Sequence, residues 1–320
     1  MGGSGFRGLV LGAAIATLSA SPTLGITPVP PGQNPAVNRA KEQLEPSWEQ
    51  VAQGLIEGYR QRRPVPWGDR KWSPEHIQQI RDRFLMALEQ DHGLPIGYKA
   101  ALVNPAVRSR FNAANPSFNA TTPIRGVLFA NMLRPSGTPI PVSIATRPLV
   151  EGDILVRVGD AAALRQARTD DEILAALDAV IPFIEVPDLI YSAESSIDVR
   201  AIAVANAGAR TGWVGYPVPM TLKDWQTLSQ IPVQMTVRTH SATTTRTIPL
   251  GKGLGMEPAA VVRWLRDGLR DERQEDLKRG DILSLGTLLP PQPAQPGMEI
   301  SLRYLGLGTG RGAIAYGRFQ

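Results

Sequence analysis

Hydrophobic and polar positions follow two different patterns along the 320 residues, and the change falls near residue 95. Before it, apolar residues recur every three or four positions, which is the spacing of one helix face. After it, short apolar runs rich in β-branched residues are broken by glycine and proline, which is typical of strands and turns. The pattern therefore predicts an α+β chain in which a helical lead-in precedes a mostly β domain.

Two helices are predicted in the lead-in. The first starts after Ser47, which can form a capping box with Gln50. The second has Ser73 as its N-cap and Pro74 at its first position, and Gly93 ends it. Each helix carries an apolar stripe that we expect to be buried: Trp48, Val51, Leu55, Ile56 and Tyr59 in the first, and Ile77, Ile80, Phe84, Leu85 and Leu88 in the second.

Beyond residue 95, two further helices are predicted among short strands. One is capped by Thr169, and the other runs through EPAAVVRWLRDGLRDE with Val261, Trp264, Leu265 and Leu269 as its buried stripe. The strands are expected in PIGYKAALV, PIRGVLFANML, LVEGDILVRVGD, PFIEVPDLI, DVRAIAVANA, GWVGYPV, VQMTVRTH, TTTRTIPLG, DILSLGTLL and MEISLRYLGLG.

The chain begins with a pattern typical of a secretory signal peptide. Arg7 precedes an apolar run from Leu9 to Leu18, and small residues follow, with cleavage expected after Ala20 or near Gly25. The run is short for a membrane span, and no cysteine follows it that could carry a lipid anchor. We therefore expect an exported protein, periplasmic or secreted, without a stable membrane anchor after cleavage. The expected divisions are a signal peptide (1–25), a proline-rich linker (26–38), a helical region (39–94) and a β-rich domain (95–320).

Composition excludes several classes of function. The formal charge is +5, but no basic run is interleaved with aromatic residues, so nucleic-acid binding is not expected. Cysteine is absent, which excludes disulfides, thiolate catalysis and zinc fingers. The three histidines, His76, His92 and His240, lie outside any short carboxylate motif, so a histidine–carboxylate pair that activates water is not expected either.

Acidic residues inside apolar strands are the strongest chemical feature. Because side chains alternate along a strand, Glu151 and Asp153 share one face of residues 149–160. Two acids at this spacing repel each other unless the face is wet or holds a cation, so both a solvated face and a metal site fit. Glu185 lies among apolar neighbours, where a carboxylate needs a proton, a cation or several donors. Together the three would form an all-oxygen site suited to Mg²⁺ or Mn²⁺.

Lys99 is the basic counterpart of these acids. It lies in the apolar run PIGYKAALVNP, directly after the lead-in. Buried lysines change their pKa readily and carry protons in catalysis, whereas a lysine on an edge strand reaches the solvent; the pattern fits both.

The segment IGYKAALVNPAVRSRFNAANP, followed by PIRGVLFANML, resembles the hydratase/decarboxylase branch of the fumarylacetoacetate hydrolase superfamily. That branch includes 2-keto-4-pentenoate hydratase and 4-oxalocrotonate decarboxylase. Gly97–Lys99, Pro123–Leu128, Glu151–Asp153 and Glu185 occur in the order of the family's motifs, and VANAGARTGWVG, EPAAVVRWLRDGL and GDILSLGTLLPPQPAQPGMEISLRYLGLG extend the similarity. Asp153 stands where the family usually has Glu, and Gly208 where it has Ser.

The resemblance implies the mixed β-roll of this superfamily's C-terminal domain and makes residues 95–320 the catalytic domain. It also implies Mg²⁺ or Mn²⁺ held by the three acids, Lys99 as the catalytic proton carrier, and a homo-oligomer. The substrate would be a small 2-keto acid, to which water is added or from which CO₂ is lost through an enolate. Asn206 and Thr287 match substrate-binding positions, and Arg108 is a further candidate to bind a substrate carboxylate.

The departures from the family's pattern, together with the export signal, favour one alternative: an exported, non-catalytic protein that binds small acids and keeps the fold. Hydrolysis of an acylpyruvate is a third interpretation, which lacks the histidine–carboxylate pair.

Overall fold

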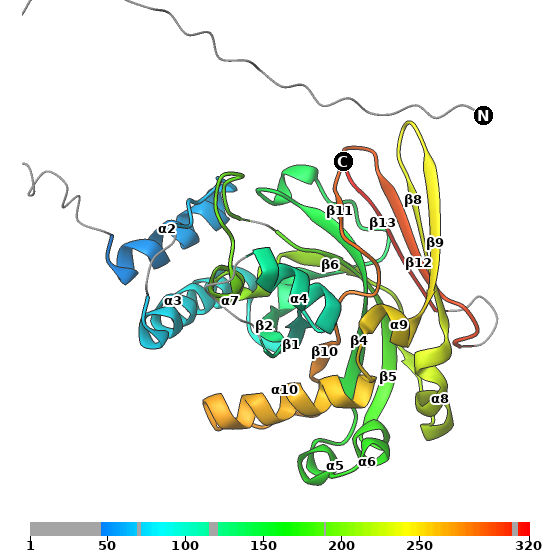
Figure 1. Cartoon of the computed structure of the whole chain (residues 1–320). Coiled ribbons are helices and arrows are strands. Elements are labelled where there is room, and N and C mark those ends of the chain that lie inside the picture. The colour runs from blue at the N-terminus through cyan, green and yellow to red at the C-terminus, as the bar shows by residue number, and fades with distance from the viewer. Residues whose placement is uncertain (1–45, 69–71, 115–120, 189, 309–312) are drawn as a thin grey trace, which may run out of the picture. The chain divides into compact units, whose positions relative to one another are not determined.

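The computed structural model describes residues 46–320 except 69–71, 115–120, 189 and 309–312 (Figure 1). The expected signal peptide (1–25), the linker (26–38) and the start of the helical region (39–45) lie outside the described residues. Contacts group Pro46–Gln320 into one compact unit, to which the description below refers. In this described part, no helix is both long enough and apolar enough to cross a membrane.

The two predicted lead-in helices are present as α2 (Trp48–Gln61) and α3 (Pro74–His92). Ser47 and Gln50 form the capping box of α2, and Ser73 caps α3 by accepting a hydrogen bond from the backbone of His76. The apolar stripes of both helices pack into one hydrophobic cluster, in which the rings of Tyr59 and Phe84 meet edge to face at 5.5 Å. Because Val127 and Phe129 belong to the same cluster, the helices pack against the sheet.

A mixed sheet forms the centre of the β-rich region, with the strand order β2-β1-β10-β4-β5-β6-β3. The pairs β1–β10 and β3–β6 are parallel and the other neighbours are antiparallel. Two short strands join it, β11 (Gln292–Pro293) beside β4 and β7 (Val218–Pro219) beside β5. The strands of the main path are β1 (Pro95–Ala101), β2 (Ile124–Phe129), β3 (Leu133–Pro135), β4 (Leu149–Val158), β5 (Leu177–Val186), β6 (Thr211–Val214) and β10 (Ile282–Ser284).

A second, antiparallel sheet has the order β13-β12-β8-β9. Its strands are β8 (Pro232–Arg238), β9 (Thr243–Pro249), β12 (Glu299–Tyr304) and β13 (Ala313–Arg318). Val233, Leu302 and Tyr304 from its inner face join the main core together with Ile154 and Ile184 of the central strands. Figure 1 shows this sheet on the opposite side of the unit from α2 and α3. The predicted α+β class and mixed β-roll are therefore confirmed.

Short helices connect the strands, and one of them corrects a prediction. DVRAIAVANA was expected to be a strand, but it forms α7 (Val199–Val204) followed by a 3₁₀ turn (Asn206–Gly208). Asp198 caps α7 by accepting a hydrogen bond from the backbone of Ala201, and alanine favours the helix. The other helices are α4 (Pro105–Ala114), α5 (Ala161–Gln166), α6 (Asp170–Ala175) with its predicted Thr169 cap, α8 (Leu222–Thr227), α9 (Leu250–Leu254) and α10 (Pro258–Arg273).

Candidate active site

Three acidic side chains meet at the centre of the mixed sheet. Glu151 and Asp153 share one face of β4, and Glu185 lies directly opposite Glu151 on β5. One carboxylate oxygen from each residue lies within 4.8 Å of the others. The side chains are 7%, 0% and 2% exposed, in that order along the chain, so the interpretation as a solvated strand face is wrong.

Donors from β10 and the turn after it hold two of these acids in place. Asp153 accepts hydrogen bonds from the Ser284 hydroxyl at 2.7 Å and from the backbone N–H of Gly286 at 3.2 Å. Glu151 accepts one from the Thr287 hydroxyl at 2.9 Å. Thr287, which was expected to bind substrate, thus contacts one of the acids, and its contact with a substrate stays a prediction. Ser284 had been assigned no role from the sequence, although the two-residue period of β10 places it on the same face of the sheet as Lys99.

Lys99 completes the cluster from β1. It is buried, and its ammonium group donates a hydrogen bond to Oε1 of Glu185. Because β1 lies between β2 and β10, the alternative of a lysine that reaches solvent from an edge strand is wrong. The pairing of the strands places Lys99 near the acids: Lys99 lies beside Ser284 on β10, and β10 lies between β1 and β4.

Burial strongly perturbs the proton affinities in this cluster. Desolvation, followed by repulsion from Glu185, raises the pKa of Glu151 well above 4.5 and raises the pKa of Asp153 from 3.8 to about 7. Burial alone would lower the pKa of Lys99, but the attraction of Glu185 and Glu151 outweighs it, so its pKa is raised. Glu151 and Asp153 therefore lie where positive charge is insufficient to offset their burial.

The cluster fits a divalent cation. If all four groups are ionised, three carboxylates face one ammonium, which leaves two negative charges buried without compensation. Oε2 of Glu185 is buried and has no hydrogen-bond partner among the described residues. The donors are carboxylate oxygens, with no nitrogen or sulfur ligand in the group, and hard oxygen ligands are those that Mg²⁺ and Mn²⁺ prefer.

A cavity of about 180 Å³ adjoins the cluster. Lys99, Glu151, Glu185 and Thr287 line it, together with residues from the end of β1, from α7 and from the loop after β5. Asp188, for which the sequence predicts no role, is also part of the wall. Its carboxylate accepts hydrogen bonds from the backbone N–H groups of Thr146 and Arg147 at about 3 Å.

Two of the predicted substrate-binding residues lie outside this lining. The amide group of buried Asn206 pairs with the backbone of Val127, accepting from its N–H at 2.7 Å and donating to its C=O at 2.9 Å. Arg108, on α4, is half-buried and donates to the backbone carbonyls of Leu102 and Val103. Both side chains thus have structural partners, and their contact with a substrate stays a prediction.

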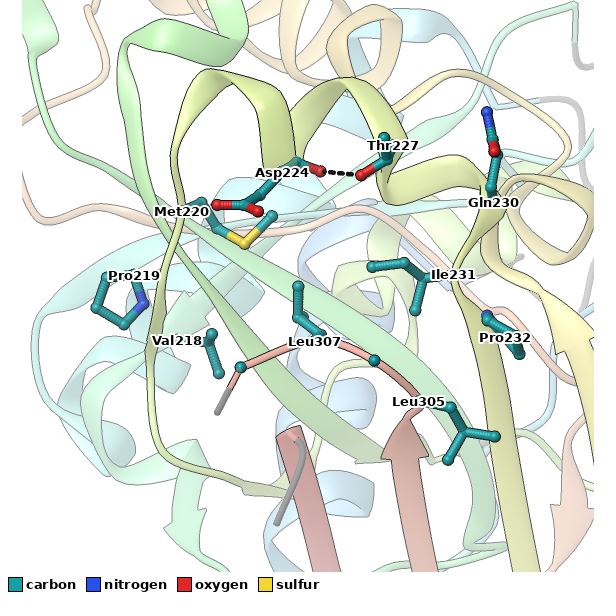
Figure 2. A pocket seen from close by; sticks show the side chains of 12 residues that line it. Val218, Pro219, Met220, Asp224, Thr227, Gln230, Ile231, Pro232, Leu305 and Leu307 are labelled. Atoms are coloured by element: carbon teal, nitrogen blue, oxygen red, sulfur yellow. Dashed lines mark hydrogen bonds between the residues drawn. The ribbon is translucent and has the colours of Figure 1, made fainter. Parts of the chain in front are cut away.

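A second pocket lies where β7, α8 and the turn after β12 meet (Figure 2). Asp224 is the only charged residue among those that line it in the described part of the chain. Its side chain caps α8, accepting hydrogen bonds from the backbone N–H and hydroxyl of Thr221. The neighbouring side chains Val218, Met220, Ile231 and Leu307 are apolar. The described lining of this pocket holds no cluster of groups that could do chemistry, so the carboxylate cluster is the better candidate.

The fold is similar to that of solved enzymes of the kind that the sequence resemblance indicated. Two structures of 4-oxalocrotonate decarboxylase from Pseudomonas putida G7, one with calcium and acetate and one with magnesium and adipate, each give a TM-score of 0.68 at 21% identity. Each match covers 86% of this chain and 99% of the decarboxylase.

Among curated proteins, the TodF product hydratase of Pseudomonas putida strain F1 is 25% identical over 225 residues. The alignment covers 69% of this chain and 76% of the hydratase. No protein-family model matches the chain.

Proposed function

We propose that this chain is a divalent-metal-dependent lyase that adds water to a small 2-hydroxydienoic acid. The observation that carries the proposal is the convergence of three buried carboxylates and one buried lysine on the wall of a single cavity. The comparisons support a metal-using enzyme for small acids, since one relative is a hydratase and the solved neighbours were crystallised with calcium or magnesium and a carboxylic acid.

Glu151, Asp153 and Glu185 would hold Mg²⁺ or Mn²⁺. When bound, the cation supplies the missing positive charge and acts as a Lewis acid toward the carboxylate and keto oxygens of the substrate. Ser284 and Thr287 fix the orientation of two of these carboxylates through their hydrogen bonds. Such supporting contacts matter because they keep the oxygens aimed at one point.

Lys99 is the group that moves protons in this scheme. It lines the cavity, and its contact with Glu185 holds the ammonium beside the acids. The ammonium gives a proton to a chain carbon as the dienol becomes a ketone, and the amine that remains takes up the proton that the enol oxygen loses, so that the ammonium is restored. Addition of water then places a hydrogen on one alkene carbon and a hydroxyl on the next, without any redox change.

The test is consumption of 2-hydroxypenta-2,4-dienoate, followed by the loss of dienol absorbance, with Mg²⁺ or Mn²⁺ and again after chelation. We expect turnover with metal, and a loss of at least about 100-fold in Lys99→Met with cation binding retained. Lys252→Met, at an exposed position on α9, is the matched control. Metal and acid binding without any turnover of the dienoate would favour the non-catalytic acid-binding protein instead.

Export to the periplasm or the medium is part of the same proposal, as is assembly into a homo-oligomer. The export signal rests on the residues before Ser21. Sedimentation of the purified protein tests the oligomer, and the mass of the mature chain tests the cleavage.

A further inference from the structure

Most of the cavity wall beside the carboxylate cluster is apolar. Four of the polar lining groups contact one another in pairs, with Lys99 bonded to Glu185 and Thr287 bonded to Glu151. Tyr191 also lines the cavity, but its hydroxyl is engaged with the carbonyl of Ala201 at 2.6 Å. Apart from Asp188, the remaining wall is built from small and aliphatic side chains and proline: Ala100, Ala101, Leu102, Leu149, Pro187, Ile197, Ile202, Ala205, Ala207 and Pro291, with Gly208.

Positive charge is scarce in this wall. Among the described lining residues, Lys99 is the only cation, and it is already paired with Glu185. The other charged residue away from the cluster is Asp188, a buried acid held by backbone N–H groups. A ligand whose far end carried a carboxylate would bury that charge without a cationic partner and in the same cavity as a fixed acid. Burial of an unpaired carboxylate is strongly unfavourable.

We infer that this cavity selects monocarboxylic 2-keto or 2-hydroxydienoic acids with an uncharged, apolar tail and rejects dicarboxylic acids of the same length. The cavity has the volume of about six water molecules, which suits a short acid. The inference rests on the proposed function and restricts its range of substrates. Loss of CO₂ from a vinylogous keto acid needs a second carboxylate at the far end of the chain, so the selection favours hydration over decarboxylation.

The test compares acids that differ only at the far end. Calorimetry on the full chain with saturating Mg²⁺ measures binding of 2-oxopentanoate against 2-oxoglutarate, and of 2-oxohexanoate against 2-oxoadipate. None of the four has the alkene needed for water addition, so the readout is independent of turnover. We expect each monocarboxylic acid to bind at least about 100-fold more tightly than its dicarboxylic partner. Equal or tighter binding of the dicarboxylic acids would overturn the inference.

A gain of function provides the converse test. Ile202→Arg places a guanidinium in the apolar wall and is expected to tighten 2-oxoglutarate binding by at least about tenfold while weakening that of 2-oxopentanoate. Ile197→Lys is a second variant at a different place in the wall, in case the first does not fold. Met86→Arg adds the same charge at a position on α3 that is 65% exposed and should change neither affinity. If both folded wall variants leave the preference unchanged, the inference fails.

Failure here and failure of the proposed function give different results. A protein that prefers the monocarboxylic acids but leaves the dienoate unchanged is not the proposed lyase, yet its selectivity is as inferred. A protein that consumes the dienoate and binds 2-oxoglutarate equally well keeps the function and loses the selectivity. No binding of any of the four acids overturns the inference.

Discussion

Asp153 is expected to make the stability of the metal-free protein fall as the pH rises. Its pKa is raised from 3.8 to about 7, first by burial and then by the charge of Glu185. Between these two pH values the folded protein holds a proton that the unfolded chain has released. This group's contribution to stability is therefore complete below pH 4 and is lost as the pH rises through 7.

The size of this effect follows from the shift. One pKa unit corresponds to about 1.4 kcal/mol, so the shift of Asp153 amounts to about 4 kcal/mol of unfolding free energy lost between pH 4 and pH 8. Glu151, whose pKa burial and Glu185 also raise, acts in the same direction. The raised pKa of Lys99 lies above this window, so its contribution is constant there. A loss of this size is large for a domain whose total stability is about 5–15 kcal/mol.

Urea unfolding in the presence of a chelator, from pH 5 to pH 8, measures the slope of the unfolding free energy against pH. Asp153→Asn removes the titrating group and keeps an oxygen that can accept from Ser284, so the slope should shrink markedly. Asp271→Asn, at an exposed position on α10, is the control and should show the same slope as the wild type. Added Mg²⁺ should restore the stability of the wild type at pH 8, because a cation that binds only the folded state stabilises it. A flat wild-type profile, or an unchanged slope in Asp153→Asn, would refute this reasoning.

Three further predictions concern other parts of the chain. Asn206→Ala should cost about 3 kcal/mol in urea unfolding, because it leaves the backbone N–H and C=O of Val127 without partners; a higher KM without loss of stability would instead support the predicted contact with substrate. Gly126→Ala would place a Cβ 2.9 Å from Cγ of Lys99 and 2.8 Å from the carbonyl oxygen of Asn206, so kcat should fall at least about tenfold as the lysine is displaced; an unchanged kcat would contradict the placement of Lys99. Mass spectrometry of the chain expressed in a bacterium should find a mature N-terminus between residues 20 and 26, and an exported protein that retains the first residue would disprove the cleavage.

Local signals predicted the helices whose ends are chemically marked. Ser47, Ser73 and Thr169 were identified as caps because each precedes an apolar helical stripe, and the structure confirms all three. The short helix α7 was missed because six residues make fewer than two turns, and over that length apolar residues fit both periods. β13 was missed as well, since the register with β12 that defines it is a contact no local pattern contains.

The site shows the same division between local and distant information. The two-residue period of a strand places Glu151 and Asp153 on one face, and this part followed from the sequence alone. The position of Glu185 opposite Glu151 depends on the register of β4 and β5. Lys99 reaches the acids because β10, from near the end of the chain, lies between β1 and β4. No residue pattern predicts that order of strands. The three acids were grouped as a possible metal site from their chemistry, and Lys99 was joined to them through the family resemblance.

Because the acids lie on β4 and β5, the burial that makes them unfavourable for folding also strengthens their binding of a cation. Nearly every residue of both strands is buried, so the carboxylates on these strands are largely shielded from bulk water. Buried charged groups are weak evidence for stability, since apolar residues of similar size often serve a fold as well or better. The same low-dielectric surroundings that make the acids unfavourable strengthen their attraction for a bound cation. An exposed edge strand would carry the same three carboxylates at little cost, but water and salt would weaken their hold on the ion. Placement on the central strands therefore lowers the folding stability of the metal-free protein and raises the affinity of the site for a cation.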